Sequence, residues 1–402
     1  MMENAMTHHV IIGAGEAGLR AAAALRDAGE RHVTLVGGEH MPSYDRPALS
    51  KPDGETGLFH RPIAVDLAGL EVVLGRTAKG IDRETKAVIL TTGERLAYDR
   101  LLLATGARPR RLACDPAGHA LMLRTLGDAE AIYGKADAGG SAILVGAGLI
   151  GLELAAELTR RGMTVRVLEA GPRALGRGVP AEIADVIVSR HRRSGVTFDF
   201  DVRIERVEHK SVVLADGARI EADLVVAAVG IEPEVGLAVS AGLACANGIE
   251  VNSRLVTSDP SIFAAGDCAV IDHPRYGRTR FETWRNACDQ GAHAAKAMLG
   301  EAASFETLPW FWSDHFDLGL QAVGLHDPSR RSARRDLADG GWLRFELDEN
   351  HVLQAAAGIG PGTSVSRDIR LAEKLIERGA FCAPEALADP GLGLKSLLKV
   401  AA

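Results

Sequence analysis

Cysteine is scarce in this chain of 402 residues, and the few cysteines follow no pairing pattern. The five cysteines are an odd number, and no two of them are separated by only two residues. A dense disulfide framework and a metal site built on paired cysteines do not fit this usage. We therefore expect reduced thiols and no bound metal.

Long apolar runs and an excess of positive charge are also missing. No stretch reaches the roughly 20 apolar residues of a membrane-spanning helix, and the first residues, MMENAMTHHV, lack a signal-peptide pattern. The 46 basic and 53 acidic residues give a formal net charge of −7. We therefore expect a cytoplasmic protein without membrane or nucleic-acid partners.

Glycine, in contrast, is abundant, with 45 residues, whereas aromatic residues make up only 4% of the chain. This composition suits tight turns between strands and helices and close packing of helices on sheets. Hydrophobic residues account for 47% and charged residues for 25%, an ordinary globular balance. The length predicts about two or three domains.

Two parts of the chain resemble each other. Residues 86–109 and 210–233 are identical at nine of 24 positions, and each segment reads as a short strand, a glycine turn and an apolar strand. A glycine-rich motif precedes each copy, VIIGAGEAGL in the first and ILVGAGLIGL in the second. The first unit is nine residues longer between motif and repeat. The irregular segment 42–51 lies in that interval, so we expect an extra loop beside a ligand there, although neutral variation in loop length would explain it as well.

Each glycine motif lies between an apolar strand and a helix-forming stretch. In this context the first glycine allows a tight turn, the second lets the backbone approach a pyrophosphate, and the third packs the helix on the sheet. The helix N-terminus then attracts the phosphates. The motif residues are Gly13, Gly15, Glu16, Ala17 and Gly18 in the first copy, and Gly146, Gly148, Leu149, Ile150 and Gly151 in the second. Two such sites predict electron transfer between a nicotinamide and a flavin, and two ligand-free turns are the simpler alternative.

An acidic residue follows each motif after the next predicted strand. Glu169 lies 18 residues past the last motif glycine, where a carboxylate accepts ribose hydroxyls and repels a 2′-phosphate. This favours NADH, while Arg166 and Arg173 keep NADPH as an alternative. Glu39 has the corresponding place in the first copy, but two glycines precede it and weaken the assignment.

A third motif, SIFAAGDC, reads as a buried strand that ends in Gly266 and Asp267. An aspartate at the carboxyl end of a strand suits a polyol chain. It also suits the cap of a following helix, and one residue can serve both purposes.

Together these motifs resemble the FAD-dependent ferredoxin reductases of bacterial oxygenases and cytochromes P450, of the putidaredoxin reductase and biphenyl dioxygenase reductase type. The resemblance runs nearly end to end, and its most specific segments are SYDRPALSK and PWFWSD. It implies an α/β fold with two Rossmann-like dinucleotide-binding domains, as in glutathione reductase, and a C-terminal α/β domain. The implied domains are an FAD domain at 1–110 and 233–305, an NAD domain at 111–232, and a C-terminal domain at 306–402.

The resemblance also implies roles for individual residues. Lys51 approaches the flavin and pairs with Glu153, although a surface lysine and a solvated glutamate are the alternatives. Trp284 and Trp312 lie along the isoalloxazine, with Trp310 as the neighbouring alternative and core packing as the simpler one. The remaining cofactor-binding positions that it implies are Arg46, Ala104, Thr105, Gly106, Arg110 (with Arg108 as competitor), Arg124, Gly230, Gly266 and Asp267.

Chemistry through a protein thiol does not fit the sequence. Disulfide reductases of the same architecture carry a redox cysteine pair after the first ADP-binding segment, and related peroxidases carry one cysteine there. Residues 40–60 contain no cysteine. We therefore interpret Cys268 and Cys288, which lie in matching motifs, as packing residues.

The resulting prediction is an oxidoreductase that passes electrons from NADH through FAD to a two-iron ferredoxin serving a P450 or Rieske-type oxygenase. Ferredoxins of this kind are acidic, so the densest basic run is a candidate docking patch, and a solvated surface is the alternative. Its arginines are Arg330, Arg331, Arg334 and Arg335. The competing functions are an NADH-dependent rubredoxin reductase, an NADH oxidase, and an association protein like apoptosis-inducing factor.

Overall fold

The computed structural model describes residues 7–52, 59–176 and 178–400. They form two compact units that the chain enters more than once. The first unit contains the chain as far as Asp45, then His60–Arg108 and Ile231–Thr307. The second contains Arg46–Phe59, Pro109–Gly230 and the chain from Leu308 onward.

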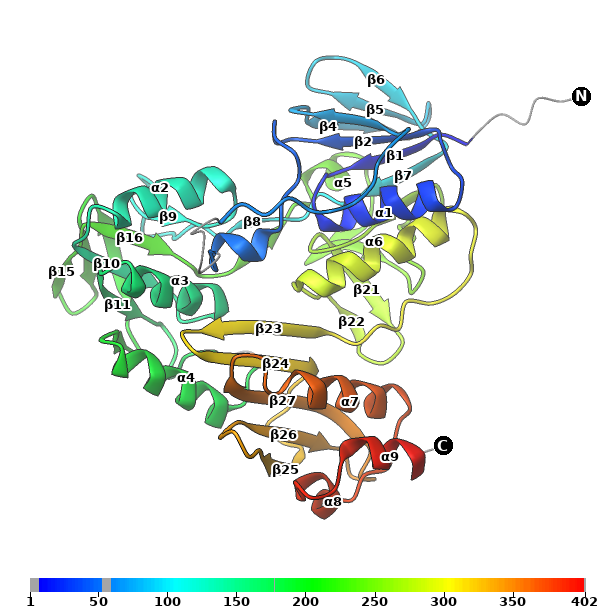
Figure 1. Cartoon of the computed structure of the whole chain (residues 1–402). Helices are drawn as coiled ribbons and strands as arrows, with labels where there is room; N and C mark the ends of the chain where they lie inside the picture. Colours follow the sequence, from blue (N-terminus) through cyan, green and yellow to red (C-terminus); the bar gives the residue numbers. More distant parts are fainter. Residues whose placement is uncertain (1–6, 53–58, 177, 401–402) are drawn as a thin grey trace, which may run out of the picture. The chain divides into compact units, whose positions relative to one another are not determined.

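The first unit is built on a parallel sheet in the order β20-β7-β1-β2-β3. Its strands are β1 (His9–Ile12), β2 (Val33–Gly37), β3 (Glu71–Leu74), β7 (Arg100–Leu103) and β20 (Ile262–Ala264). Helices α1 (Glu16–Asp27) and α6 (Trp284–Met298) pack side by side (Figure 1). A Cβ at Gly291 of α6 would lie 2.2 Å from the carbonyl oxygen of Ala17 in α1, so this close packing requires glycine.

Two further sheets, of three and four strands, and a short helix also belong to the first unit. One is antiparallel, with β4 (Ala78–Asp82), β5 (Ala87–Leu90) and β6 (Arg95–Ala97). The other contains β18 (Cys245–Ala246), β19 (Gly248–Val251), β21 (Ala269–His273) and β22 (Gly277–Thr279). The helix is α5 (Gly236–Ser240). The short strands β8 (Ala107–Pro109) and β17 (Ile231–Pro233) end the two repeat copies and pair with each other.

The second unit repeats this design. Its parallel sheet, read as β9-β16-β10-β11-β12, matches the first sheet in four strands, since β16-β10-β11-β12 correspond to β7-β1-β2-β3. The outer strands differ, because β9 is the first strand of its sheet along the chain and β20 is the last of its own. Its elements are β9 (Leu121–Met122), α2 (Leu126–Ala136), β10 (Ser141–Val145), α3 (Leu149–Arg160), β11 (Thr164–Leu168), α4 (Ala181–Arg193), β12 (Thr197–Asp199) and β16 (Leu224–Ala227). An antiparallel sheet of β13 (Ile204–Glu208), β14 (Ser211–Leu214) and β15 (Arg219–Glu221) accompanies it. The repeat found in the sequence is therefore a repeat of structure.

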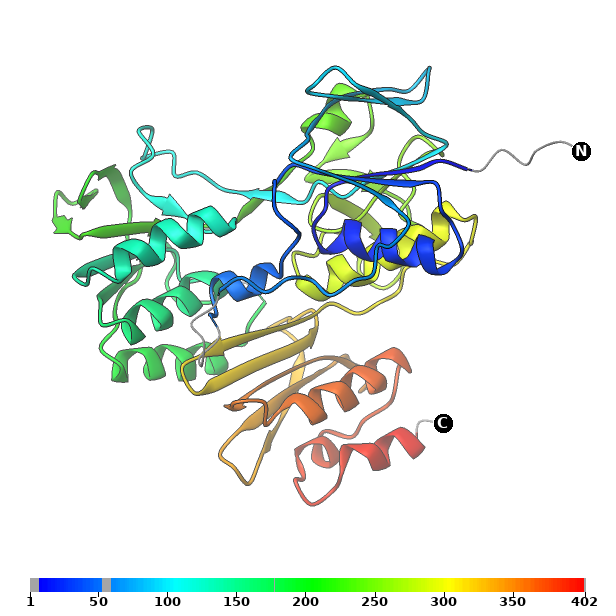
Figure 2. The ribbon, with the colours of Figure 1, turned by 45° about the horizontal axis from the view of Figure 1, so that its top comes forward.

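The C-terminal part of the second unit is an antiparallel sheet in the order β23-β24-β27-β26-β25. Its elements are β23 (Trp310–His315), β24 (Leu318–Gly324), β25 (Arg331–Asp336), β26 (Trp342–Leu347), β27 (Leu353–Pro361), α7 (Ser366–Glu377), α8 (Pro384–Ala388) and α9 (Leu394–Val400). Figures 1 and 2 show α7 lying along this sheet, where it contacts β24 and β27.

The predicted fold class, with two Rossmann-like domains and a C-terminal α/β domain, is confirmed. The exact domain bounds stay a prediction. Within the part of the chain that is described, no helix combines the length and apolar character needed to cross a membrane.

A buried histidine pair joins α4 to the edge strand β23 inside the second unit. His191 Nε2 lies 3.4 Å from His315 Nδ1, and neither residue is exposed. Burial, with a smaller contribution from Arg190 and Arg160, lowers the pKa of His191 to about 4. Burial, the neighbouring His191, Lys51 and Arg160 lower the pKa of His315 well below its ordinary value. Both imidazoles are therefore neutral in the folded protein at neutral pH.

This pair predicts acid destabilisation. In the unfolded chain the His191 imidazole takes up a proton at about pH 6.5, whereas in the folded protein it does so only near pH 4. Stability is therefore complete above pH 6.5 and falls as the pH drops towards 4, on the order of 1 kcal/mol per pH unit for each histidine. Urea unfolding at pH 7 and pH 5 measures the loss. His191→Leu should flatten this pH dependence, and an unchanged slope would contradict the assignment.

Candidate functional site

The first glycine motif forms the turn between β1 and α1. Gly13 has a φ of +115°, and a Cβ there would lie 2.1 Å from the carbonyl oxygen of Ala104. A Cβ on Gly18 would lie 1.8 Å from the carbonyl oxygen of Gly13. Gly15 is different, because it precedes α1 with an ordinary φ of −79° and a Cβ there would meet no atom within 4 Å. The turn therefore packs closely against main-chain atoms at Gly13 and Gly18. At Gly15 it leaves space in front of the helix N-terminus, as a bound pyrophosphate requires.

The second motif has the same geometry between β10 and α3. Gly146 has a φ of +103°, and its Cβ would lie 2.5 Å from the carbonyl oxygen of Ala228. A Cβ on Gly151 would clash with the carbonyl oxygen of Gly146, whereas a Cβ on Gly148 would meet no atom within 4 Å. Ala228 is the repeat counterpart of Ala104 and was missing from the predicted site. The next residues are Leu149, which is half-buried, and Ile150, whose apolar side chain is exposed beside the turn.

Glu169 lies directly after β11 and holds the second turn. Its carboxylate accepts the main-chain N–H groups of Ala147 at 2.7 Å and Gly171 at 2.8 Å. Arg166 forms a two-point ion pair with Asp199. Arg173 donates to main-chain carbonyls of the loop that follows. Because both arginines are engaged by other groups and a carboxylate lies where a 2′-phosphate would bind, this geometry favours NADH over NADPH.

Glu39 follows β2 in the first unit and accepts a 2.6 Å hydrogen bond from the Tyr44 hydroxyl. One of the two glycines before Glu39 is explained by packing, since a Cβ at Gly37 would lie 2.8 Å from the Cβ of Ala14 in the glycine turn. Glycine at this position thus lets β2 approach the turn closely. Glu39 remains a candidate for the adenosine ribose. Tyr44 had no predicted role.

Trp284 is the first residue of α6, and its indole N–H donates to Glu16 at 2.9 Å. Arg20 and the Cys288 thiol also donate to this carboxylate. Glu16 therefore anchors the start of α6 to the first turn of α1. Gly266 is adjacent, since its Cβ would lie 3.1 Å from that of Ala17, and this brings half-buried Asp267 to the same helix end.

All five cysteines are free. Burial raises the pKa of each thiol, and for Cys288 burial together with Glu16 raises the pKa to about 12. Protonated thiols are poor nucleophiles, so the described cysteines suit packing rather than redox chemistry. Within the described residues no group of histidine, cysteine and acidic side chains is arranged to hold a metal.

The segment after β7 is fixed to the segment after β17. Thr105 Oγ1 donates to the carbonyl of Glu234 at 2.6 Å, and the N–H of Glu234 donates to Gly106. Arg108 is exposed and pairs with Glu232 and Glu234. These carboxylates occupy the Arg108 guanidinium.

Within the second unit the main-chain N–H of Arg110 donates to the carbonyl of Gly230 at 2.9 Å. Part of the extra loop also packs within the second unit. Its short 3₁₀ helix η1 (Arg46–Leu49) is held by the Tyr133 hydroxyl, which donates to the carbonyl of Leu49 at 2.6 Å. The Arg46 guanidinium donates to the carbonyl of Arg124, so two predicted cofactor arginines are neighbours.

Lys51 and Glu153 meet in the second unit. Lys51 Nζ lies 3.4 Å from Glu153 Oε1, and the Glu153 side chain is 3% exposed. Ser50 Oγ donates to Oε2 and Ser313 Oγ donates to Oε1, both at 2.6 Å. The buried carboxyl group is thus hydrogen-bonded on both oxygens, as a polar group at this depth requires. The family resemblance implied the ion pair, and nothing in the motifs indicated the two serines.

The ammonium of Lys51 also lies over an aromatic ring. It is 4.4 Å from the ring centroid of Trp312, which is stacked on Trp310 with centroids 5.4 Å apart. A cation over a tryptophan face is attracted by about 0.5–2 kcal/mol. These contacts fix the position of the Lys51 ammonium, and the side chain is only 18% exposed. Lys51 is therefore not a free surface lysine.

Ser313→Ala should destabilise the protein. It removes a hydroxyl donor from a buried carboxylate whose Oε1 then faces only Lys51 at 3.4 Å. Such losses cost about 1–3 kcal/mol. Chemical denaturation of the variant measures the loss, with Ser240→Ala at the exposed end of α5 as the matched control. Equal stability of the two variants would contradict a structural role for the Ser313 hydroxyl.

The basic run requires a correction. Arg335 is 3% exposed, and its guanidinium donates to the carbonyls of Leu387 and Ala386 in α8, so it is not part of a docking surface. The cause is strand alternation, because neighbouring residues of β25 face opposite sides of the sheet. Arg334 is exposed and pairs with Asp336.

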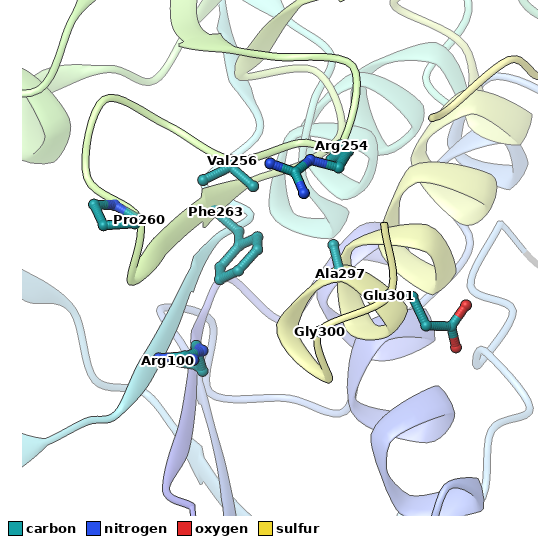
Figure 3. Close-up of a pocket in the computed structure, with 8 residues that line it drawn as sticks. All are labelled: Arg100, Arg254, Val256, Pro260, Phe263, Ala297, Gly300 and Glu301. Carbon is teal, nitrogen blue, oxygen red and sulfur yellow. The ribbon is translucent and has the colours of Figure 1, made fainter. Parts of the chain in front are cut away.

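A small cavity in the first unit is distinct from the glycine turns. It has a volume of about 170 Å³ and lies at the start of β7 and β20, whereas nucleotides bind beyond the carboxyl ends of parallel strands. Figure 3 shows Arg100 and Arg254 on different sides of Phe263, with Glu301 pointing away. We assign this cavity no part in the site.

The residues present fit a flavin dinucleotide and a nicotinamide dinucleotide. Each unit has one open glycine turn at a helix N-terminus, and a Cβ at Gly15 or Gly148 would fill the space that a pyrophosphate needs. The second unit also contains the Lys51 ammonium, which its contacts hold in position. A fixed positive charge suits a group that gains negative charge on reduction.

Comparison with known proteins gives consistent matches over nearly the whole chain. Residues 7–291 match the family model described as pyridine nucleotide-disulphide oxidoreductase, and residues 310–398 match the reductase C-terminal model. The chain is 37% identical to the ferredoxin–NAD(+) reductase component of the anthranilate 1,2-dioxygenase system of Burkholderia cepacia, over 97% of this chain and 98% of that protein. It is 34% identical to putidaredoxin reductase of Pseudomonas putida, over 99% and 98% of the two chains.

Solved structures agree with these matches. The ferredoxin reductase for the CYP199A2 system from Rhodopseudomonas palustris superimposes with a TM-score of 0.90 at 34% identity, covering 98% of this chain and all of the other (100%). A covalent putidaredoxin reductase–putidaredoxin complex superimposes with a TM-score of 0.89 at 32% identity, covering 99% of each chain.

Proposed function

This chain belongs to the pyridine nucleotide-disulphide oxidoreductase family, and on that basis we propose that it passes electrons from NADH through FAD to a two-iron ferredoxin serving a P450 or Rieske-type oxygenase. The family membership confirms the resemblance drawn from the sequence motifs. FAD and NADH are the cofactors of these reductases. The observation that carries the proposal is the pair of open glycine turns together with the Lys51–Glu153 ion pair and the absence of reactive thiols among the described cysteines.

A bound flavin links a two-electron donor to a one-electron acceptor, which is the chemistry that this conversion needs. In the proposal the first turn, with Gly15 and Glu16, receives the FAD diphosphate. Arg46, Arg110 and Arg124 supply positive charge, and arginine suits phosphate because it binds in a two-point fork. Trp284 and Trp312 shield the ring system from water.

The second turn, with Gly148 and Glu169, orients NADH. No residue forms a covalent bond to substrate in this proposal, and positioning supplies most of the rate. The Lys51 ammonium stabilises the negative charge that develops on reduction, and Glu153 keeps that ammonium in place. Protonated cysteines take no part, which distinguishes the chain from disulfide reductases with a similar fold.

The ferredoxin docks, in this proposal, on the basic residues at the start of β25. Arg330, Arg331 and Arg334 remain as candidates, of which Arg334 pairs with Asp336 and Arg331 contacts His351. Acidic ferredoxins would still be steered towards this strand, because rim charges act mainly on the association rate. A cytoplasmic location is a further part of the proposal, supported by five free cysteines.

Charge reversal tests this docking surface. Arg330→Glu with Arg334→Glu should raise the KM for ferredoxin several-fold at low salt and weaken its salt dependence, while the rate of flavin reduction by NADH stays unchanged. Arg206→Glu, at an exposed arginine of β13, is the matched control. An unchanged KM and salt dependence in the double variant would remove the basic run from the docking surface.

The function itself is tested by steady-state assays with different acceptors. Purified enzyme with NADH should reduce cytochrome c rapidly only when a two-iron ferredoxin is added. Equal rates with rubredoxin would favour a rubredoxin reductase, and rapid oxygen consumption without any acceptor would favour an NADH oxidase. Slow reduction followed by a long-lived charge-transfer complex would favour an association protein like apoptosis-inducing factor.

A further inference from the structure

The carboxylate nearest to Lys51 is that of Asp314 rather than that of Glu153. Lys51 Nζ lies 3.0 Å from Asp314 Oδ2 and 3.4 Å from Glu153 Oε1. We propose that Asp314 is a positioning residue, which shares the Lys51 ammonium with Glu153 and thereby sets the charge that the ammonium presents to the flavin. The inference rests on the proposed function, because it assumes that Lys51 faces the bound FAD.

Glu153 does not depend on Lys51 alone. Both of its oxygens accept hydroxyl hydrogen bonds at 2.6 Å, from Ser50 and Ser313, and these remain wherever the ammonium lies. Asp314 has a different environment, since its side chain is 50% exposed and keeps part of its hydration. The ammonium can therefore lean towards Asp314 without leaving a buried carboxylate unsatisfied.

The strand geometry directs Asp314 to this place. Trp312 and Asp314 are two residues apart on β23 and therefore face the same side of the sheet, with Ser313 on the other side. Gly319 of β24 pairs with Asp314 across the ladder. This position must be glycine, because a Cβ there would lie 1.9 Å from the carbonyl oxygen of Gly362. Asp314 thus has no cross-strand side chain beside it and lies against Lys51, which also covers Trp312.

The charge balance has a consequence for electron transfer. One ammonium shared by two carboxylates leaves the group with one net negative charge. Removing the Asp314 charge makes the group neutral and leaves the ammonium to Glu153. A less negative environment stabilises a reduced, anionic flavin, so the midpoint potential of bound FAD should rise.

The test is a measurement of the FAD midpoint potential in holoenzyme carrying Asp314→Asn. We expect a shift to higher potential, and Asp314→Glu should restore most of the wild-type value. Asp317→Asn is the matched control, because it removes an exposed carboxylate three residues away that pairs with Arg190 and not with Lys51. The control should show little shift.

Three results would overturn the inference: a wild-type potential in Asp314→Asn, an equal shift in Asp317→Asn, or a change in ferredoxin KM without a shift in potential. The last result would make Asp314 a docking residue. If Asp314→Asn does not retain FAD, Asp314→Ser is measured in the same way. Wild-type enzyme without FAD, or with FAD that NADH does not reduce, would instead refute the proposed function.

Discussion

Gly148→Ala is expected to fold with wild-type stability and to bind NADH more weakly. Gly148 has an ordinary φ of −80°, and a Cβ there would meet no protein atom within 4 Å. The added methyl group therefore strains nothing in the free protein. It occupies the space through which the pyrophosphate of NADH approaches the main chain, and such overpacking costs about 1–3 kcal/mol, or roughly 5- to 150-fold in Kd.

Gly162→Ala separates this effect from the general cost of losing a glycine. Gly162 lies just after α3 with a φ of +85° and open space around it, so alanine there strains the backbone without entering the nucleotide site. We expect a loss of stability of about 1 kcal/mol and unchanged NADH affinity. Titration calorimetry and chemical denaturation of both variants measure the two quantities. Wild-type NADH affinity in Gly148→Ala would show that the nucleotide does not bind at this turn.

Lys51→Met is expected to slow the reduction of bound FAD by NADH by about 10- to 100-fold. The ammonium favours the reduced flavin, and a preorganised charge of this kind supplies about 1.4–2.7 kcal/mol to the reaction. The variant should keep its fold, since the Glu153 carboxylate retains the Ser50 and Ser313 hydroxyls. Anaerobic stopped-flow absorbance at the flavin band gives the rate.

Lys135→Met, at an exposed lysine in the last turn of α2, is the control for the loss of a positive charge alone. It should be reduced at the wild-type rate. If Lys51→Met keeps the wild-type rate as well, Lys51 serves only to neutralise Glu153. Asp314 could then not act on the flavin through Lys51.

The local parts of this site follow from the sequence because their requirements are local. Gly13 and Gly146 are glycines since main-chain atoms lie within 2.5 Å of where a Cβ would be, and the motif GxGxxG records that constraint. The repeat at 86–109 and 210–233 likewise predicted two similar units, and the two parallel sheets of the structure correspond in four strands. Ala228 was predictable from its match to Ala104 but was overlooked.

The long-range parts could not be derived from spacing. Lys51, Glu153 and Asp314 lie far apart in the chain, and only packing of the extra loop, α3 and β23 within one unit brings them together. The family resemblance supplied the first two residues. Ser50 and Ser313 were within reach, because each is next to a named residue in a specific motif, but a serine in a motif does not reveal its partner.

The error at Arg335 has a similar cause. Four arginines within six residues look like one charged surface, but alternation along β25 turns one of them inward. Its acceptors are the carbonyls of Ala386 and Leu387, about 50 residues later in the chain. No local sequence pattern predicts a contact at that distance. Burial then lowers the pKa of this guanidinium, which stays paired with main-chain dipoles.

An anaerobic double-mixing experiment on the purified protein tests the proposed function most directly. We expect a yellow protein whose flavin absorbance is bleached by one equivalent of NADH and returns when two equivalents of oxidised two-iron ferredoxin are added. A protein that remains colourless after incubation with FAD, or a bleached flavin that ferredoxin does not reoxidise, would contradict it.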